Sequence, residues 1–177
     1  MNNFEENYIQ IFYGIELCLE NKLQFPTLSL IYSTIDSLAW IAYGDIGVGS
    51  GFKKWVDEYM FKEKKSNITP IDLYSARCAI IHTLTPNSRD SNKKQASVIA
   101  YAWGNEDVNI LEKSIENSKY DNLKVIHIND LFENLKLGTL GFINSDHIKQ
   151  KDCLNRMEEH YMEISKNDLE NYNKNFE

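Results

Sequence analysis

TPIDLYSARCAIIHTLTP, residues 69–86, is the stretch of sequence that predicts most about the fold. Thr69 suits a helix N-cap, and Pro70 suits the first helical position, where its fixed φ and missing N–H cost nothing. Asp72 lies three residues after the cap, where its charge complements the positive end of the helix dipole. Because the residue before Pro86 is pushed out of the α region, we predict a helix that ends near Leu84.

An arginine lies on the face of this helix that should be buried. At about 100° per residue, Arg77 falls inside the apolar arc of the helix. That arc consists of Leu73, Ala76, Ile80 and Leu84. A buried charge without a partner costs several kcal/mol, so Arg77 must meet a carboxylate or line a cleft or a subunit interface. Asp36, at the edge of the apolar face of a second predicted helix, is the leading candidate partner.

His82 is in the last turn of the same helix, about 140° round from Arg77. At this angle, one helix should not easily bring both side chains to one phosphate group. Cys78 and Ser75 neighbour His82 on the wheel and, with Asp36 and Asp72, are candidate supporting residues. The plainer interpretation is structural: a paired arginine, and a histidine held at the helix end by the dipole.

The rest of the chain predicts a mainly α protein, one domain over residues 1–177. A small two-stranded insertion of strand, helix and strand is predicted at 97–128, with parallel pairing favoured and antiparallel pairing left open. GDIGVGSG, residues 44–51, is expected to connect two helices, and NSRDSNKKQ, residues 87–95, to be a loop. Further helices are predicted from Asn3 to about Lys22, from Pro26 to Tyr43, through Phe52–Met60 and from an Asn129 cap to about Leu140. A last helix is predicted to begin at Ser145, with Leu154, Met157, Tyr161 and Ile164 on one face.

Composition limits the classes of function. The 177 residues carry a net charge of −7, which argues against broad electrostatic capture of nucleic acid and leaves room only for a local site. Arg89, Lys93 and Lys94 are candidate RNA contacts, although solvated loop charge is the favoured interpretation of each. The absence of a basic, apolar leader, of a membrane-spanning stretch and of paired cysteines favours a cytoplasmic protein without a membrane partner.

Neither a metal site nor a cofactor is predicted. Three of the four histidines, His127, His147 and His160, are scattered without ligand spacing, and each is expected to be a surface or partly buried residue. A covalent mechanism with Cys78 as nucleophile and His82 as base is disfavoured. A mid-helix cysteine lacks the helix N-terminal amides that lower a thiol pKa and form an oxyanion hole.

RCAIIH, Arg77 to His82, resembles the motif of the HEPN superfamily, in which an arginine is followed after four residues by a histidine. The helix with Asp36 and Trp40, the FKKWVDEY helix and the ARCAIIHT helix are similar to a group of bacterial HEPN-like proteins. The resemblance covers about the first half of the chain. It implies a helical bundle that dimerises and often acts as a metal-independent ribonuclease. Many members carry a polar residue after the arginine, where this chain has Cys78.

The resemblance therefore implies a metal-independent endoribonuclease that cleaves RNA by 2′-OH attack, with Arg77 and His82 as catalytic residues. Such cleavage needs a base, an acid and a fixed cation, which histidine and arginine supply. A homodimer could place both pairs around one groove, and an antitoxin or regulatory protein could control the activity, as in toxin–antitoxin or defence systems. The alternative is a non-catalytic, HEPN-like dimeric module that binds nucleotides or other proteins.

Overall fold

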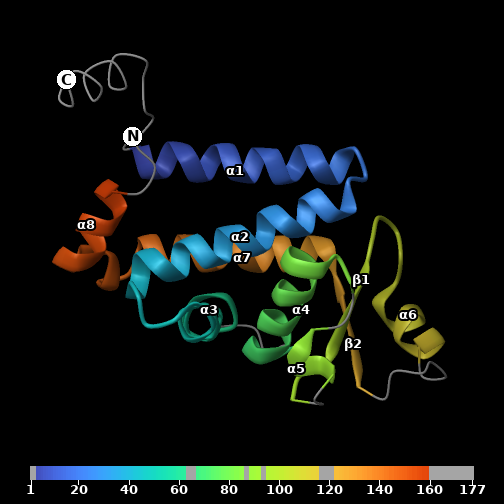
Figure 1. The fold of residues 1–177 in the computed structure, drawn as a ribbon. Helices are drawn as coiled ribbons and strands as arrows, with labels where there is room; N and C mark the ends of the chain where they lie inside the picture. Colours follow the sequence, from blue (N-terminus) through green and yellow to red (C-terminus); the bar gives the residue numbers. More distant parts are fainter. Residues whose placement is uncertain (1–2, 63–66, 86–87, 93–94, 116–121, 160–177) are drawn as a thin grey trace, which may run out of the picture.

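The computed structural model describes residues 3–62, 67–85, 88–92, 95–115 and 122–159, and shows a mainly helical protein with a two-stranded sheet, as predicted. The long helix α2 lies in the middle of the helical part, and α1, α3, α4, α7 and α8 all contact it (Figure 1). In chain order the helices are α1 (Asn3–Glu20), α2 (Gln24–Tyr43), α3 (Val48–Trp55), α4 (Pro70–Thr83), α5 (Arg89–Asn92), α6 (Val108–Ile115), α7 (Ile128–Ile143) and α8 (Lys151–Glu159). None of these helices has the length and apolar character that crossing a membrane requires.

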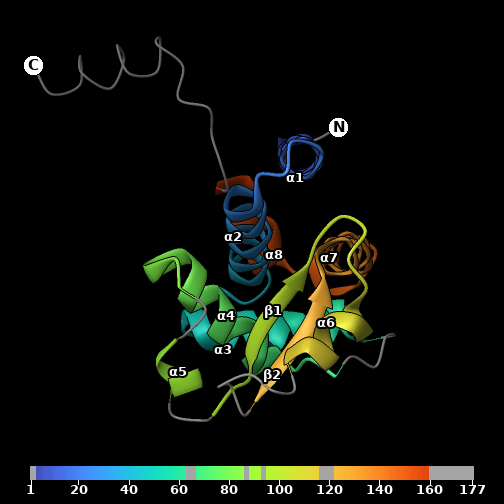
Figure 2. The same cartoon turned by 90° about the vertical axis from the view of Figure 1, so that its right-hand side faces the viewer.

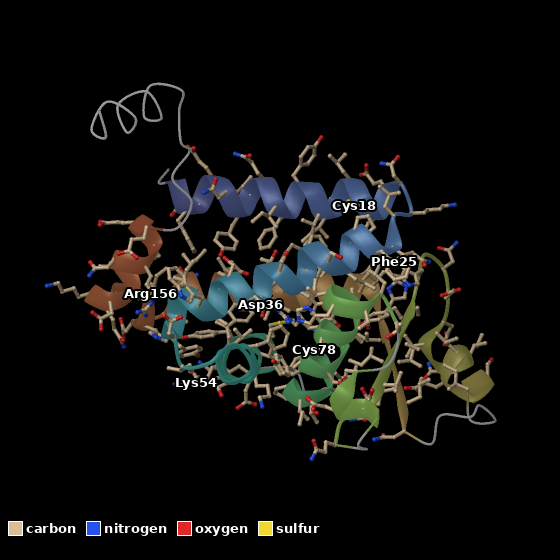
Figure 3. The ribbon with its side chains drawn as sticks, in the orientation of Figure 1. Cys18, Phe25, Asp36, Lys54, Cys78 and Arg156 are labelled. Atoms are coloured by element: carbon tan, nitrogen blue, oxygen red, sulfur yellow. The ribbon has the colours of Figure 1, made fainter. Side chains whose placement is uncertain are left out.

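Helix α2 is central because its sequence is apolar on more than one side. Its fully buried apolar side chains are Ile31, Tyr32, Ile35, Leu38 and Ile41. Its last carbonyl groups are satisfied by cationic or N–H donors from the far end of the chain, as helix C-termini favour. Arg156 of α8 donates through Nε to the Ile41 carbonyl at 2.7 Å, and His147 donates through Nε2 to the Ala42 carbonyl at 2.9 Å. Figure 3 shows Arg156 at this end of α2.

The predicted ends of α4 are confirmed. Thr69 is the N-cap in a capping box, since its hydroxyl accepts a hydrogen bond from the Asp72 N–H and the Asp72 carboxylate accepts one from the Thr69 N–H. Pro70 is the first helical residue. At the other end, Thr83 is the last helical residue. Leu84 follows as the C-cap in the left-handed conformation, with φ 51°, and ends the helix.

The sheet resolves the alternative left open by the sequence. Strands β1 (Val98–Ala102) and β2 (Leu123–His127) pair in parallel, with Val98 opposite Leu123 and Ala102 opposite His127. Helix α6 lies in the crossover between the strands (Figure 2). A parallel pair needs such a long connection, and the predicted strand–helix–strand order at 97–128 supplies it.

Three local predictions are wrong. Residues 89–92 form the short helix α5 in a segment expected to be a loop, where Ser88 caps the turn by accepting from the Ser91 N–H. Helix α7 begins earlier than expected, because the imidazole of His127, and not Asn129, is the N-cap that accepts from a backbone N–H. Helix α3 begins at Val48, inside the glycine-rich connection, and continues as a π-helix, η1 (Val56–Met60).

The C-terminal helix differs from its prediction as well. The chain first makes a 3₁₀ turn, η2 (His147–Lys149), and α8 then begins at Lys151 instead of Ser145. Leu154 lies in α8 but is 44% exposed, so it does not mark a buried face. Met157, a second expected member of that face, is partly buried and packs against the core. The other two, Tyr161 and Ile164, lie outside the described residues.

Asp72 ties the start of α4 to the start of the sheet. Its carboxylate is buried and accepts the Ser97 N–H at 2.6 Å and the Lys124 ammonium at 2.7 Å, in addition to the two groups of Thr69. Burial by itself raises a carboxyl pKa, but the hydrogen bonds from Lys124, Thr69 and Ser97 together outweigh it and lower the pKa of Asp72 to about 2. Asp72 is therefore a structural residue, far along α4 from His82.

We expect Asp72 to stabilise the fold in a pH-dependent way. Its folded pKa, about 2, is lower than the ordinary value of 3.8. Its contribution is therefore present above pH 4 and is lost as the pH falls towards 2. The lost free energy of unfolding should be about 2 kcal/mol. Urea unfolding of the parent and of Asp72→Asn at pH 5 and pH 2 checks this. Their stability difference should shrink by that amount, and a constant difference would contradict it.

Candidate active site

Arg77 of α4 and Asp36 of α2 form the ion pair that the sequence suggested. Arg77 Nε and Nη2 lie 2.8 Å and 2.7 Å from the same carboxylate oxygen, Asp36 Oδ2. The side chains are only 13% and 22% exposed, so solvent screens the pair weakly. Two contacts from one guanidinium edge hold the arginine in a defined orientation.

The two partners respond differently to this partial burial. Burial raises the pKa of Asp36, and the hydrogen bond and charge of Arg77 offset this only in part. The second carboxylate oxygen, Oδ1, is buried without a hydrogen-bond partner among the described residues, which agrees with that direction. The pKa of Arg77 is raised because contact with Asp36 outweighs the opposing effect of burial. Arg77 is thus the main group that opposes the effect of burial on Asp36.

His82 completes the cluster from the same helix. Its Nε2 lies 2.8 Å from Arg77 Nη1. A guanidinium has no acceptor, so Nε2 must accept this hydrogen bond, and the His82 ring in this arrangement is neutral with its proton on Nδ1. The two side chains therefore meet, although the helical wheel places them about 140° apart. The arginine side chain is long enough to reach along the helix to the exposed imidazole.

A groove of about 590 Å³ borders this cluster. Arg77 and Asp36 line it, together with residues of the connection from α2 to α3. The remaining lining residues are Ser37, Ala39, Trp40, Gly44, Asp45, Gly47, Val48 and Gly51. Gly44 and Gly47 have positive φ values of 63° and 91°, a conformation that side-chain-bearing residues rarely adopt. The groove places the Arg77 guanidinium and the Trp40 ring in one concave surface, and the His82 imidazole adjoins that surface through its contact with Arg77.

Comparison with known proteins finds no match: no protein-family model, no curated protein and no solved structure is significantly similar to this chain.

The structure gathers some of the predicted site residues and separates others. Cys78 is half-buried beside Arg77 and Tyr74, on the side of α4 that approaches Asp36 (Figure 3). Ser75 is buried and shares a hydrogen bond with the Ser88 hydroxyl, away from the groove. With Asp72 in the cap network, neither Ser75 nor Asp72 can touch a ligand in the groove.

Of the three basic residues proposed as RNA contacts, the structure describes only Arg89. Arg89 lies in α5, shortly after α4, while Lys93 and Lys94 lie outside the described residues. Among the described residues, no group of three or more histidine, cysteine, aspartate or glutamate side chains is placed to hold a metal ion. The contacts of His82 are with Arg77 and not with the Cys78 thiol, so the pairing needed for a cysteine nucleophile is not formed.

Sequence reasoning missed Trp40, Asp45 and Val48 as groove residues. The signal available was the glycine-rich segment at residues 44–51, which we interpreted only as a connection. This segment does connect α2 to α3, but several of its residues also line the groove beside Arg77.

Proposed function

We propose that the chain is a metal-independent endoribonuclease of the HEPN type, which cleaves RNA by attack of a 2′-OH on the neighbouring phosphate. The observation that carries this proposal is the contact of one guanidinium with both a carboxylate and a neutral imidazole at the edge of a groove. Asp36 orients Arg77, Arg77 binds the scissile phosphate, and His82 moves the proton. The RCAIIH motif and its HEPN-like context support the same assignment.

The geometry suggests how the proton transfer begins. When a phosphate enters, Arg77 Nη1 exchanges its hydrogen bond with His82 for one with a phosphate oxygen. This frees the lone pair of His82 Nε2 to accept the 2′-OH proton. The guanidinium meanwhile stabilises the charge that develops on the phosphoryl oxygens, and its planar fork matches their geometry.

A second copy of the chain supplies the acid. The leaving 5′ oxygen needs a proton, and the His82 imidazolium of the second copy can donate it across a shared groove. The products are a 2′,3′-cyclic phosphate and a 5′-OH. Val48 lines the groove and Ile46 lies in the neighbouring connection; they are 63% and 48% exposed, and burying them between two copies favours such a pairing.

We therefore expect a homodimer with twice the chain mass of 20.6 kDa in light scattering at micromolar concentration. Val48→Glu should shift the protein towards monomer, because it puts a charge into the buried rim. Ile110→Glu is the matched control, since Ile110 is 67% exposed on α6, and it should leave the dimer intact. A monomer at every concentration would remove the composite site.

We expect cleavage to need no metal ion. Excess EDTA should leave the rate on a labelled RNA unchanged, since Arg77 provides the positive charge. An all-2′-deoxy oligonucleotide of the same sequence should not be cut, because it lacks the nucleophile. Loss of activity with EDTA and its recovery with magnesium would instead indicate a metal site.

A second candidate function is a non-catalytic dimeric module that binds nucleotides or proteins. The observation in its favour is that two nitrogens of Arg77, Nε and Nη2, already contact the Asp36 carboxylate, as in a structural ion pair. Such a module would bind RNA or nucleotide without cutting it, and replacing His82 would change nothing. In either case an antitoxin or another regulatory protein remains a possible partner.

A further inference from the structure

Helix α1 exposes a stripe of large apolar side chains on the face turned away from α2. The exposed fractions are 55% for Ile9, 61% for Tyr13 and 39% for Leu17. Their spacing of four residues places them along one line of the helix. Phe4, Tyr8 and Ile15 face inward and are buried, so the fold already has the apolar contacts it needs from α1. Figures 1 and 2 both show α1 at the edge of the molecule.

Carboxylates flank this stripe. At about 100° per residue, Glu6, Glu16 and Glu20 fall within about 60° of Tyr13, among the apolar side chains. All three are exposed. Helix α1 contains no lysine or arginine to balance them. An apolar line with acidic borders is a combination that a neutral or acidic partner cannot cover without bringing like charges together or burying unpaired carboxylates.

We propose that this outer face of α1, formed by Glu6, Ile9, Tyr13, Glu16, Leu17 and Glu20, binds a basic amphipathic helix of a partner protein. The apolar residues of that helix pack against Ile9, Tyr13 and Leu17, and its flanking lysines or arginines pair with the three glutamates. The 18 residues of α1 are about 27 Å long, which matches a partner helix of about five turns.

The other available occupants have the wrong charge. A second copy of the chain would bring three further carboxylates against the same stripe. The chain's own residues 160–177 carry four carboxylates against two lysines, so they too are acidic. A membrane surface with anionic lipids would be repelled for the same reason. The site is separate from Arg77 and His82, so it stands whether or not the chain is a ribonuclease.

The test uses two synthetic 18-residue helical peptides that share one leucine stripe, one flanked by lysines and the other by glutamates. Anisotropy of the labelled peptides with the purified full-length chain should show low-micromolar binding of the lysine peptide at 50 mM salt. Binding should weaken at least tenfold at 300 mM salt. The glutamate peptide should not bind.

Two sets of variants locate the site. The first variant combines Ile9→Ser, Tyr13→Ser and Leu17→Ser, and it should weaken binding at least tenfold. The second combines Glu6→Gln, Glu16→Gln and Glu20→Gln, which keeps the apolar stripe, and it should weaken binding by at least the same factor. The matched control is Leu137→Ser with Leu140→Ser on α7, each 56% exposed, which should bind as the parent does. Circular dichroism checks that each variant is folded. The proposal is wrong if the parent does not bind the lysine peptide, or if the glutamine variant binds it equally well.

Discussion

Arg77→Ala is expected to have the largest effect of any single substitution, because it removes RNA cleavage and weakens the fold together. In the proposed mechanism Arg77 holds the phosphate, and its loss also leaves Asp36 as a partly buried carboxylate without its partner. Breaking a fully buried pair costs about 3–5 kcal/mol and breaking an exposed one less than about 1. For this partly buried pair we expect a loss of about 2–3 kcal/mol in the free energy of unfolding.

Arg77→Lys separates charge from geometry. Lysine keeps the positive charge and can still reach Asp36, so most of the stability should return. Cleavage should not recover, since an ammonium lacks the planar fork with which the guanidinium holds Asp36 through Nε and Nη2 and presents Nη1 to the phosphate. Urea unfolding and cleavage of a labelled RNA, measured on the same preparations, check both parts. Full rescue of cleavage by lysine would show that charge alone suffices at this position.

His82→Ala should reduce turnover by about 10²–10⁴, the usual contribution of a positioned acid or base. Its side chain is exposed, and Arg77 keeps its two contacts with Asp36 when the imidazole is removed. The melting temperature and the oligomeric state should therefore stay close to those of the parent. Cleavage of a labelled RNA in EDTA is the measurement.

His127→Ala is the matched histidine control for that prediction. His127 caps α7 and lies within reach of the Gly104 carbonyl, away from the groove. Its loss should lower stability by about 1 kcal/mol, as the loss of a helix cap does, and leave turnover unchanged. If His82→Ala cuts RNA as fast as the parent, His82 has a structural role. The ribonuclease proposal is then wrong, and the non-catalytic binding module becomes the favoured function.

The parts of the fold that could be predicted are those decided by local chemistry. Thr69 and Pro70 define the start of α4 through capping and a fixed φ, and the strand–helix–strand pattern defines β1 and β2. The Asp36–Arg77 pair could also be predicted, because an arginine on an apolar face requires a carboxylate and Asp36 lies at the edge of a neighbouring apolar face.

The parts that could not be predicted depend on how distant segments and long side chains meet. A helical wheel gives the direction of Cβ atoms, so it misses that Arg77 bends along α4 to reach His82. The groove depends on where α3 and the connection before it lie against α2, which no local pattern reveals. The start of α7 shifted because the His127 imidazole satisfies a backbone N–H, a role that histidine seldom signals in a sequence.

The most direct test of 2′-OH attack at the Arg77–His82 pair is the chemistry of the new RNA ends. An RNA cut by the parent protein in EDTA should carry a 2′,3′-cyclic phosphate on one fragment and a 5′-OH on the other. A single 2′-deoxy nucleotide at the cleavage position should block the cut, and His82→Ala should form both ends about 10²–10⁴ times more slowly. Fragments with a 3′-OH and a 5′-phosphate, or cleavage at the deoxy position, would contradict the mechanism.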